Sequence, residues 1–267
     1  MHLPAELKKY LRKRIEAINS ILKKPQRLFS PDDYHKLRVE VKKTKALLAV
    51  IKYCAGRFNN KEYLKLFNPL FKKAGKVRDL QLEMQAMDNY TSTGPFPNYI
   101  KWLSEERDKA ASDFFSIVND DLRKEIREGY KSIAHYFHDV HKKEVDNYID
   151  GKKEKIIRLM KKKTSTDEQT HDVRKRLKEF FYTKKMIISK DIPVTNTEEI
   201  QDVLGKWHDH LAMADHLQTG IEMDKVDMRE KKRIRSLKKV ITEKKESFYN
   251  KINEMKPGFL QSFRLQS

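Results

Sequence analysis

A histidine, an arginine and a lysine recur in one order at two places in this chain. The spacing His-x-x-Arg-x-x-x-Lys begins at His35 and again at His171. Residues three and four positions apart lie on one face of a helix, so each copy aligns its three side chains. A guanidinium fork, an ammonium and an imidazole that gains a proton as the pH falls all bind phosphate oxygens. The spacing therefore predicts anion binding in both copies.

Each copy follows a sequence that is typical of a helix start. Ser30 and Thr166, five residues before the two histidines, have the hydroxyl side chains that are preferred at helix N-caps. An Asp or Gln three residues after each cap completes a capping box. We therefore expect helices over about residues 30–56 and 166–189.

The cations of each helix form one stripe on a wheel of about 100° per residue. The stripe of the first helix contains His35, Arg38, Lys42 and Lys45. The stripe of the second helix contains His171, Arg174, Lys175, Lys178 and Lys185. Apolar side chains such as Leu37 and Leu177 lie nearly opposite. Because like charges one turn apart repel each other, a bound phosphate chain would relieve this repulsion.

The flank of the first stripe is apolar. Val39, Ala46 and Val50 lie within about 20–60° of His35 on the wheel. Such a flank is too apolar for a freely exposed surface. We infer that the first stripe lines a groove or pore between helices.

A second pattern also occurs twice, after the His-x-x-Arg helix in each half of the chain. Residues 75–79 read Gly-Lys-Val-Arg-Asp, and residues 205–209 read Gly-Lys-Trp-His-Asp. We expect each glycine to mark a turn. Two matched landmarks in the same order indicate a duplicated unit of about four helices.

The duplicated His-x-x-Arg helix and Gly-x-x-basic-Asp pattern resemble the CHAD family, the conserved histidine α-helical domain. The resemblance covers about residues 5–256. It implies an all-α fold of two four-helix units related by pseudo-twofold symmetry around a basic central groove or pore. The implied repeat units are about 5–130 and 131–256 of a single domain, with 257–267 as a C-terminal tail. The resemblance also implies binding of inorganic polyphosphate without its cleavage.

Matched position by position, the resemblance implies phosphate contacts from both copies. The matching residues are His35, Arg38, Lys42, Lys45, Arg78, His171, Arg174 and Lys178. Phe181 departs from the family pattern, because a basic residue is typical there, and so does His208, which replaces an uncharged polar residue. These departures concern the distal contacts of the second copy. Nothing in the chain resembles the metal-binding β-barrel that some family members carry to cleave triphosphate.

The composition agrees with a polyanion-binding protein. The 267 residues include 58 Lys and Arg against 39 Asp and Glu, which gives a formal net charge of +19. Solubility alone needs a net charge of only about 2–8, so the excess predicts a negatively charged partner. Cys54 is the single cysteine, which excludes an intramolecular disulfide and a zinc site of several thiolates.

The sequence predicts neither a cofactor nor a catalytic activity. It contains no Walker loop, dinucleotide fingerprint or Gly-x-Ser-x-Gly elbow. It has no run of about 18 apolar residues and no apolar signal core after Met1, so no membrane insertion is expected. We expect a cytoplasmic protein, associated with polyphosphate granules if it binds polyphosphate. The oligomeric state stays open.

The remaining chain also reads as helices, and no segment alternates as a strand does. The expected helices cover about residues 4–24, 60–92, 98–163, 195–218 and 224–256. Pro69 and Gly75 are expected to interrupt the second of these, and Gly129 and Gly151 the third. Pro257 is expected to end the last one.

The last expected helix carries further cations. Arg229 and Arg233 share one of its faces and are candidates to extend the path of a bound anion. Glu230 and Glu243 lie nearby, so a solvated surface of mixed charge is an equal alternative.

Two other functions compete with polyphosphate binding. Nucleic-acid binding would need aromatic side chains between the cations, whereas Phe180 falls with the apolar residues of its helix. The third hypothesis is a metal site built on histidines. The two clusters with suitable spacing are His135, His138 and Asp139, and His208, His210 and His216.

Overall fold

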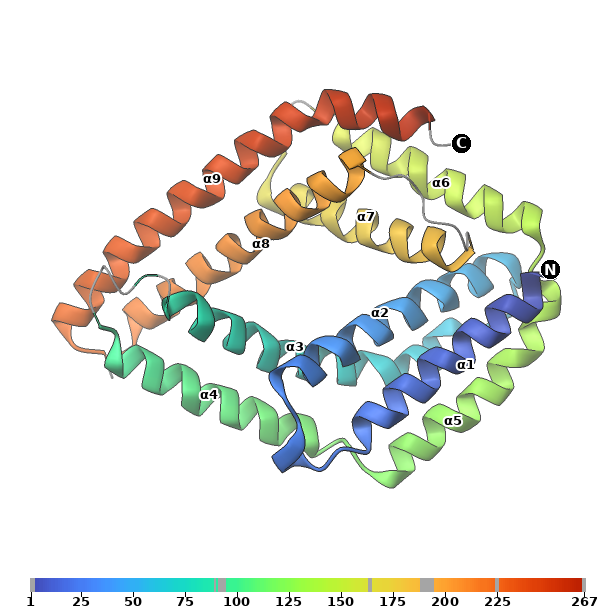
Figure 1. Cartoon of the computed structure of the whole chain (residues 1–267), viewed down its shortest axis with the longest axis horizontal. Coiled ribbons are helices and arrows are strands. Elements are labelled where there is room, and N and C mark those ends of the chain that lie inside the picture. Colours follow the sequence, from blue (N-terminus) through green and yellow to red (C-terminus); the bar gives the residue numbers. More distant parts are fainter. Residues whose placement is uncertain are drawn as a thin grey trace. The chain divides into compact units, whose positions relative to one another are not determined.

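The computed structural model describes residues 3–88, 90, 95–162, 165–187, 195–223 and 226–265, and every regular element in these ranges is helical (Figure 1). The α-helices are α1 (Leu3–Leu22), α2 (Pro31–Cys54), α3 (Asn60–Asp88), α4 (Pro97–Phe115), α5 (Asp120–Ala134), α6 (Lys142–Met160), α7 (Asp167–Ile187), α8 (Thr195–Glu222) and α9 (Met228–Leu265). The 3-10 helices are η1 (Gln26–Leu28) and η3 (His135–Asp139). The predicted all-α fold class is confirmed.

The chain forms two compact units, each built from three stretches of sequence. Unit 1 contains Met1–Leu82, Glu105–Lys152 and Glu179–Asp191. Unit 2 contains Glu83–Ser104, Lys153–Lys178 and Ile192–Ser267. The helices α3, α4, α6 and α7 therefore each contribute residues to both units. The repeat boundary near residue 130 and the pseudo-twofold symmetry stay predictions.

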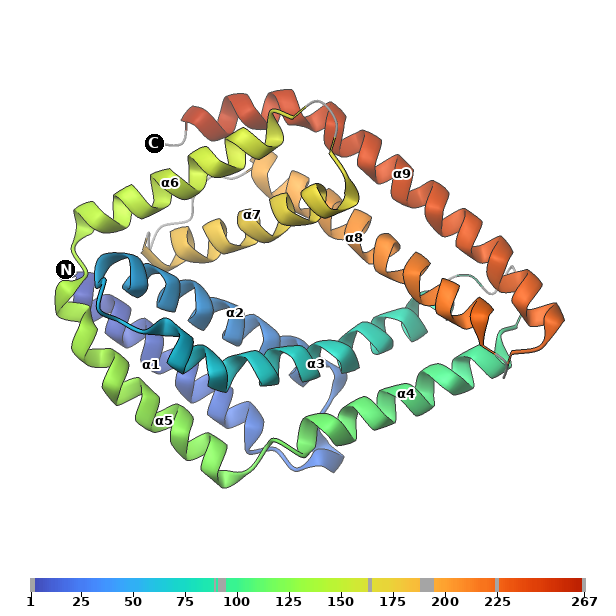
Figure 2. The same ribbon diagram turned by 180° about the vertical axis from the view of Figure 1, so that it is seen from behind.

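In unit 1, α1 lies between α2 and α5 (Figures 1 and 2). The buried face of α1 follows the helical period, with Leu7, Leu11, Ile15, Ile18 and Leu22 at spacings of three and four. Burial of each such side chain contributes about 1.5–3 kcal/mol. This packing fixes one side of α2 and leaves its opposite side for polar residues.

An aromatic cluster in unit 1 holds the start of α2. The ring of Phe29 lies 4.6 Å from the ring of Tyr34 and 5.5 Å from that of Phe114. Tyr34 is buried, and its desolvation raises the pKa of its hydroxyl to about 12. The first turn of α2 is therefore fixed against the end of α4.

In unit 2, α8 and α9 run side by side in opposite directions (Figures 1 and 2). Trp207 and Leu217 of α8 are fully buried, as are Ile234, Leu237 and Ile241 of α9. The spacing of the buried residues in α9 is again three and four, which places them on one face. The cations of α9 are therefore directed away from this face.

Buried carboxylates in unit 2 hold the start of α4. Glu230 of α9 is completely buried and accepts a hydrogen bond from the backbone N–H of Tyr99 at 2.9 Å. A carboxylate at a helix N-terminus is favourable because it meets unsatisfied N–H groups. The Tyr99 hydroxyl donates to the buried carboxylate of Glu83 at 2.6 Å, and His216 of α8 contacts the same carboxylate.

The predicted end of the last helix at Pro257 is wrong, because α9 continues through Pro257 to Leu265. A proline inside a helix costs about 3 kcal/mol. Phe259 and Phe263, two and six residues further on, are buried, and their rings stack at 4.7 Å. Burial of these two rings offsets the cost of the proline.

Other predicted interruptions are also wrong. Pro69 and Gly75 lie inside the continuous α3, and Gly129 and Gly151 lie inside α5 and α6. One break follows α5, at η3, and the other falls before α5, where the Asn119 side chain accepts a hydrogen bond from the N–H of Leu122 at 2.8 Å. A capping side chain thus decided this boundary, whereas the glycines did not.

Candidate functional site

The predicted capping box at the start of α2 is confirmed. The Ser30 hydroxyl accepts a hydrogen bond from the N–H of Asp33 at 3.2 Å, and the Ser30 N–H donates to the Asp33 carboxylate at 2.8 Å. Lys24 donates to the same carboxylate at 2.6 Å. Burial alone would raise the pKa of Asp33, but these hydrogen bonds outweigh it and lower the pKa. The cap fixes the turn from which His35 projects.

Three cations of α2 gather around one aromatic ring of α3. The Arg38 guanidinium carbon lies 4.5 Å from the Phe71 ring centroid, and the ammonium nitrogens of Lys42 and Lys45 lie 5.5 Å and 5.2 Å from it. Each such contact with an aromatic ring contributes about 0.5–1 kcal/mol when exposed. We call Phe71 with these three cations the Phe71 cluster.

Two hydrogen bonds of the Phe71 cluster go to neutral partners. Arg38 donates to the backbone carbonyl of Phe71 at 3.2 Å, and Lys45 donates to the side-chain amide of Asn68 at 2.8 Å. Neither bond neutralises a charge. Lys45 is half-buried, and this burial lowers the pKa of its ammonium. The cluster therefore holds positive charge in a fixed place.

The buried Gly75 makes room for Arg38. A Cβ atom at this position would lie 1.8 Å from the Arg38 Nη1 atom. The absence of a side chain lets the guanidinium lie directly against the backbone of α3. This is the physical reason for a glycine inside α3, at the place where the sequence predicted a turn.

Two of the predicted site residues, His35 and Arg78, interact electrostatically in unit 1. Partial burial is the largest cause of the lowered pKa of His35, and the charge of Arg78 is the next. The Nε of Arg78 is buried and has no hydrogen-bond partner among the described residues. His35 itself is exposed, so an anion can reach it.

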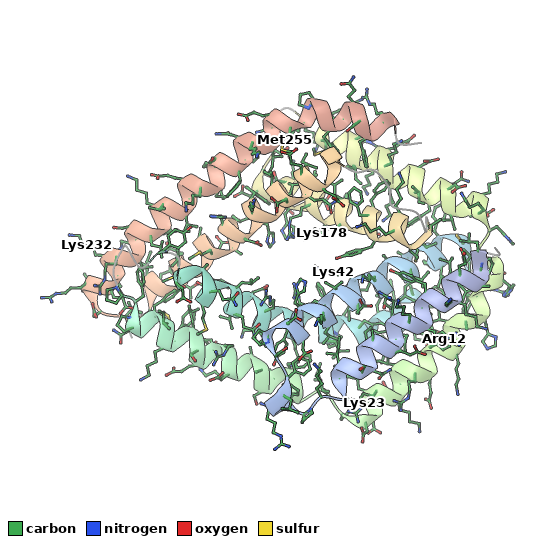
Figure 3. The ribbon with its side chains drawn as sticks, in the orientation of Figure 1. Arg12, Lys23, Lys42, Lys178, Lys232 and Met255 are labelled. Carbon is green, nitrogen blue, oxygen red and sulfur yellow. The ribbon has the colours of Figure 1, made fainter. Side chains whose placement is uncertain are left out.

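The apolar flank of the α2 stripe behaves as the sequence indicates. Ala46 and Val50 are buried, and Val39 is half-buried. Figure 3 shows Lys42 on the side of α2 that faces away from α1. Within unit 1 the stripe is thus bordered by α3, and the pore inferred from the sequence stays a prediction.

The second capping box, at the start of α7, is confirmed as well. The Thr166 hydroxyl accepts a hydrogen bond from the N–H of Gln169 at 3.2 Å, and the Thr166 N–H donates to the Gln169 side chain at 3.4 Å. Lys245 of α9 contacts Asp167 at 3.0 Å. These contacts orient the first turns of α7 within unit 2.

Two histidines meet in unit 2. The rings of His171 on α7 and His208 on α8 lie 4.8 Å apart and nearly perpendicular. Burial, then His208, then Lys175 and Arg174 lower the pKa of His171 to about 4, although Asp172 opposes them. His171 is therefore neutral at pH 7. A bound anion would raise its pKa.

The other predicted cations of α7 differ in exposure. Arg174 and Lys178 are half-buried in unit 2, and Lys175 is exposed. Lys185 is exposed in the part of α7 that belongs to unit 1. Asp172, the one acidic residue at the margin of the stripe, pairs with Arg176 at 2.7 Å.

Among the described residues, no contact is seen between the predicted cations of α9 and the cationic face of α7. Arg229 is exposed, and Arg233 is half-buried. Figure 3 shows that Lys232, between them, lies on the side of α9 away from α8. Other cations of the same helix line a pocket of about 740 Å³ beside Gln218, namely Arg235, Lys238 and Lys239.

The histidine clusters do not assemble in the described residues. No group of three or more His, Cys, Asp or Glu side chains there has the geometry of a metal site. His135, His138 and Asp139 lie in η3, where His138 contacts Asp139 at 2.8 Å and Arg57 also pairs with Asp139. His216 contacts the buried Glu83 instead of the other two histidines of its cluster.

Sequence reasoning missed some neighbours of the site. Phe71 and Asn68 lie on α3 one and two turns before the Gly-x-x-basic-Asp pattern. His208 was considered as a departure from the family pattern and as a candidate metal ligand, although it occupies the basic position of that pattern. Arg78 and His208 occupy the same position of the duplicated pattern, and this match in the sequence could have identified His208 as a site residue. In the structure Arg78 lowers the pKa of His35, and His208 lowers the pKa of His171.

None of the described helices is long and apolar enough to span a membrane.

The fold and the two cationic faces define an all-α protein with a duplicated His-x-x-Arg helix, each copy beside a second basic residue from a neighbouring helix. A family model described as the CHAD domain matches residues 9–218. Because the match covers most of the chain, the chain belongs to the CHAD domain family.

Solved structures are similar in fold. PptA from Streptomyces chartreusis has a TM-score of 0.74 at 11% identity, and the match covers 94% of this chain and 98% of that one. The CHAD domain from the plant Ricinus communis has a TM-score of 0.66 at 14% identity, and the match covers 99% of this chain and 91% of that one. No curated protein matches the chain.

Proposed function

We propose that this chain binds inorganic polyphosphate through the cationic faces of α2 and α7 and does not cleave it. The observation that carries the proposal is the Phe71 cluster, in which Arg38, Lys42 and Lys45 are held around one ring. Aligned cations repel each other, and a phosphate chain replaces this repulsion with charge-assisted hydrogen bonds.

A ligand without bases fits the Phe71 cluster better than a nucleic acid does. Recognition of single-stranded nucleic acid uses exposed aromatic faces on which bases stack. The Phe71 ring is instead occupied by three cations of the same protein. The cluster therefore offers charges to a backbone of phosphates and no free ring to a base.

The decisive experiment is a competition assay. Labelled long-chain polyphosphate is titrated onto the protein, and single-stranded RNA, duplex DNA and triphosphate then compete at equal phosphate concentration. We expect polyphosphate to bind most tightly and its affinity to fall steeply with salt, because counterions are released. Equal competition by RNA would favour nucleic-acid binding instead.

The site assignment is tested by the double variant Arg38→Glu with Arg174→Glu. We expect it to lose most of the affinity for polyphosphate while its helical circular dichroism is kept. The matched control is Lys9→Glu with Lys155→Glu, which changes the net charge equally at exposed positions of α1 and α6. Equal losses in both double variants would refute a specific site. Lys42→Gln with Lys178→Gln repeats the test with a milder change.

The absence of cleavage has its own test. Prolonged incubation with polyphosphate, with and without divalent metal ions, should release no orthophosphate above background. We further propose that the protein associates with polyphosphate granules in the cytoplasm. Imaging of a fluorescent fusion in cells that contain granules and in cells that lack them would check that location.

A further inference from the structure

A second pocket lies in unit 2, on α8 and α9 beside Tyr90. Its volume is about 460 Å³, which is within the range of small-molecule sites. The lining residues are Tyr90, Lys206, His210, Lys244, Ser247 and Phe248. They combine three aromatic rings, two ammonium groups and the two hydroxyls of Tyr90 and Ser247. No feature of the polyphosphate proposal uses any of them.

The rings and cations of this pocket are interleaved. The Lys244 ammonium lies 4.7 Å from the Tyr90 ring centroid and donates to the Tyr90 hydroxyl at 3.1 Å. The rings of His210 and Phe248 lie 5.1 Å apart. The His210 Nδ1 contacts the backbone oxygen of Lys206 at 2.7 Å, which fixes the orientation of its ring. Unlike Phe71, the half-buried Phe248 has no cation described above its ring.

The pocket lies on a different side of α8 from the histidine pair. His208 projects toward His171 on α7. Lys206 and His210 are two residues before and after it, and two residues correspond to about 200° around a helix. The pocket is therefore separate from the cationic face of α7, although both belong to unit 2.

We propose that this pocket binds a nucleotide, with the base against Phe248 and His210 and the phosphates at Lys206 and Lys244. A planar ring uses the aromatic side chains, and the phosphates use the ammonium groups and the Ser247 hydroxyl. Lys206 pairs with Asp202 at 2.8 Å, but both side chains are largely exposed. Such a surface pair is weak and leaves the ammonium available to a phosphate.

The test compares ATP with its parts by isothermal titration calorimetry. Base stacking predicts that ATP binds about tenfold more tightly than tripolyphosphate. Adenosine, which lacks the phosphates, should bind far more weakly than ATP. Equal affinities for ATP and tripolyphosphate would overturn the proposal, because a purely ionic surface does not distinguish them.

Variants assign the binding to this pocket. Phe248→Leu should remove the preference for ATP over tripolyphosphate and leave polyphosphate binding unchanged. Phe115→Leu, a half-buried phenyl ring in unit 1, is the matched control and should keep the preference. Lys244 is exposed, and Lys244→Gln should weaken the affinity for ATP about tenfold. This variant tests the site if Phe248→Leu fails to fold. Wild-type ATP affinity in Lys244→Gln would refute the site.

The two proposals fail separately. Loss of polyphosphate binding in the Arg38→Glu and Arg174→Glu variant bears only on the cationic faces. Loss of the ATP preference in Phe248→Leu bears only on the pocket.

Discussion

The two copies of the His-x-x-Arg helix place the same side chains on a helix face but hold them differently. On α2, Arg38 packs against Phe71 and occupies the space left by Gly75. On α7, His171 contacts His208, and a Cβ on the matching Gly205 would meet nothing within 4 Å. The motif therefore sets which groups face the ligand, and the neighbouring helix sets their position and their pKa.

The largest expected difference between the copies is in their glycines. Gly75→Ala places a methyl group where the Arg38 guanidinium lies, so the guanidinium must move away from the Phe71 carbonyl. Arg38 is then no longer held where it would contact a phosphate, and one lost charge-assisted contact to the ligand, worth about 1.5 kcal/mol, should lower polyphosphate affinity roughly tenfold. Stability should change little, since alanine gains about 0.8–1 kcal/mol of helix propensity over glycine.

Gly205→Ala is the matched control in α8. It should raise the free energy of unfolding by up to about 1 kcal/mol and leave affinity unchanged. Denaturant titration and polyphosphate titration of both variants measure the two quantities. Equal affinity losses at Gly75 and Gly205 would contradict the asymmetry.

The next largest effect concerns the pH dependence of stability and of polyphosphate affinity, and both should follow the titration of His171. Its pKa of about 4 lies below the usual value for histidine, so the neutral form is favoured in the folded protein. The stability that this contributes is present above about pH 6.5 and is lost as the pH falls toward 4. A polyanion favours the protonated form, so polyphosphate affinity should rise several-fold over the same range.

Titration of the imidazole protons by NMR measures the pKa of His171 directly. His208→Gln should raise the pKa of His171, because His208 is the second largest cause, after burial, of its lowering. Added polyphosphate should raise it further. His171→Gln should flatten both pH profiles. A His171 that titrates near 6.5 without ligand would show that the pair is not formed.

The smallest effect is expected from the ring of the Phe71 cluster. Phe71→Leu keeps an apolar side chain but removes the attraction to the three cations, which is worth about 0.5–1 kcal/mol per exposed contact. We expect thermal unfolding at a slightly lower temperature and at most about a threefold change in affinity. A loss of affinity as large as that of Gly75→Ala would mean that the ring itself contacts the ligand.

Local sequence patterns determined the cationic faces and the helix starts that orient them, but not where helices are interrupted or end. Ser30 with Asp33 and Thr166 with Gln169 marked two helix starts correctly, because a capping box acts within one turn. Proline and glycine were poor guides. Pro257 stays helical because Phe259 and Phe263 are buried by tertiary packing, and this burial is not visible in the adjacent residues.

By itself, the sequence determined the all-α fold, the cationic faces of the two repeated helices and the excess of positive charge, since helix period and charge are properties of the chain alone. Only the tertiary structure decided that Phe71 underlies three cations, that Gly75 makes room for Arg38 and that His208 lowers the pKa of His171. Each of these depends on a helix distant in sequence, because burial and short distances between charges arise only when helices pack.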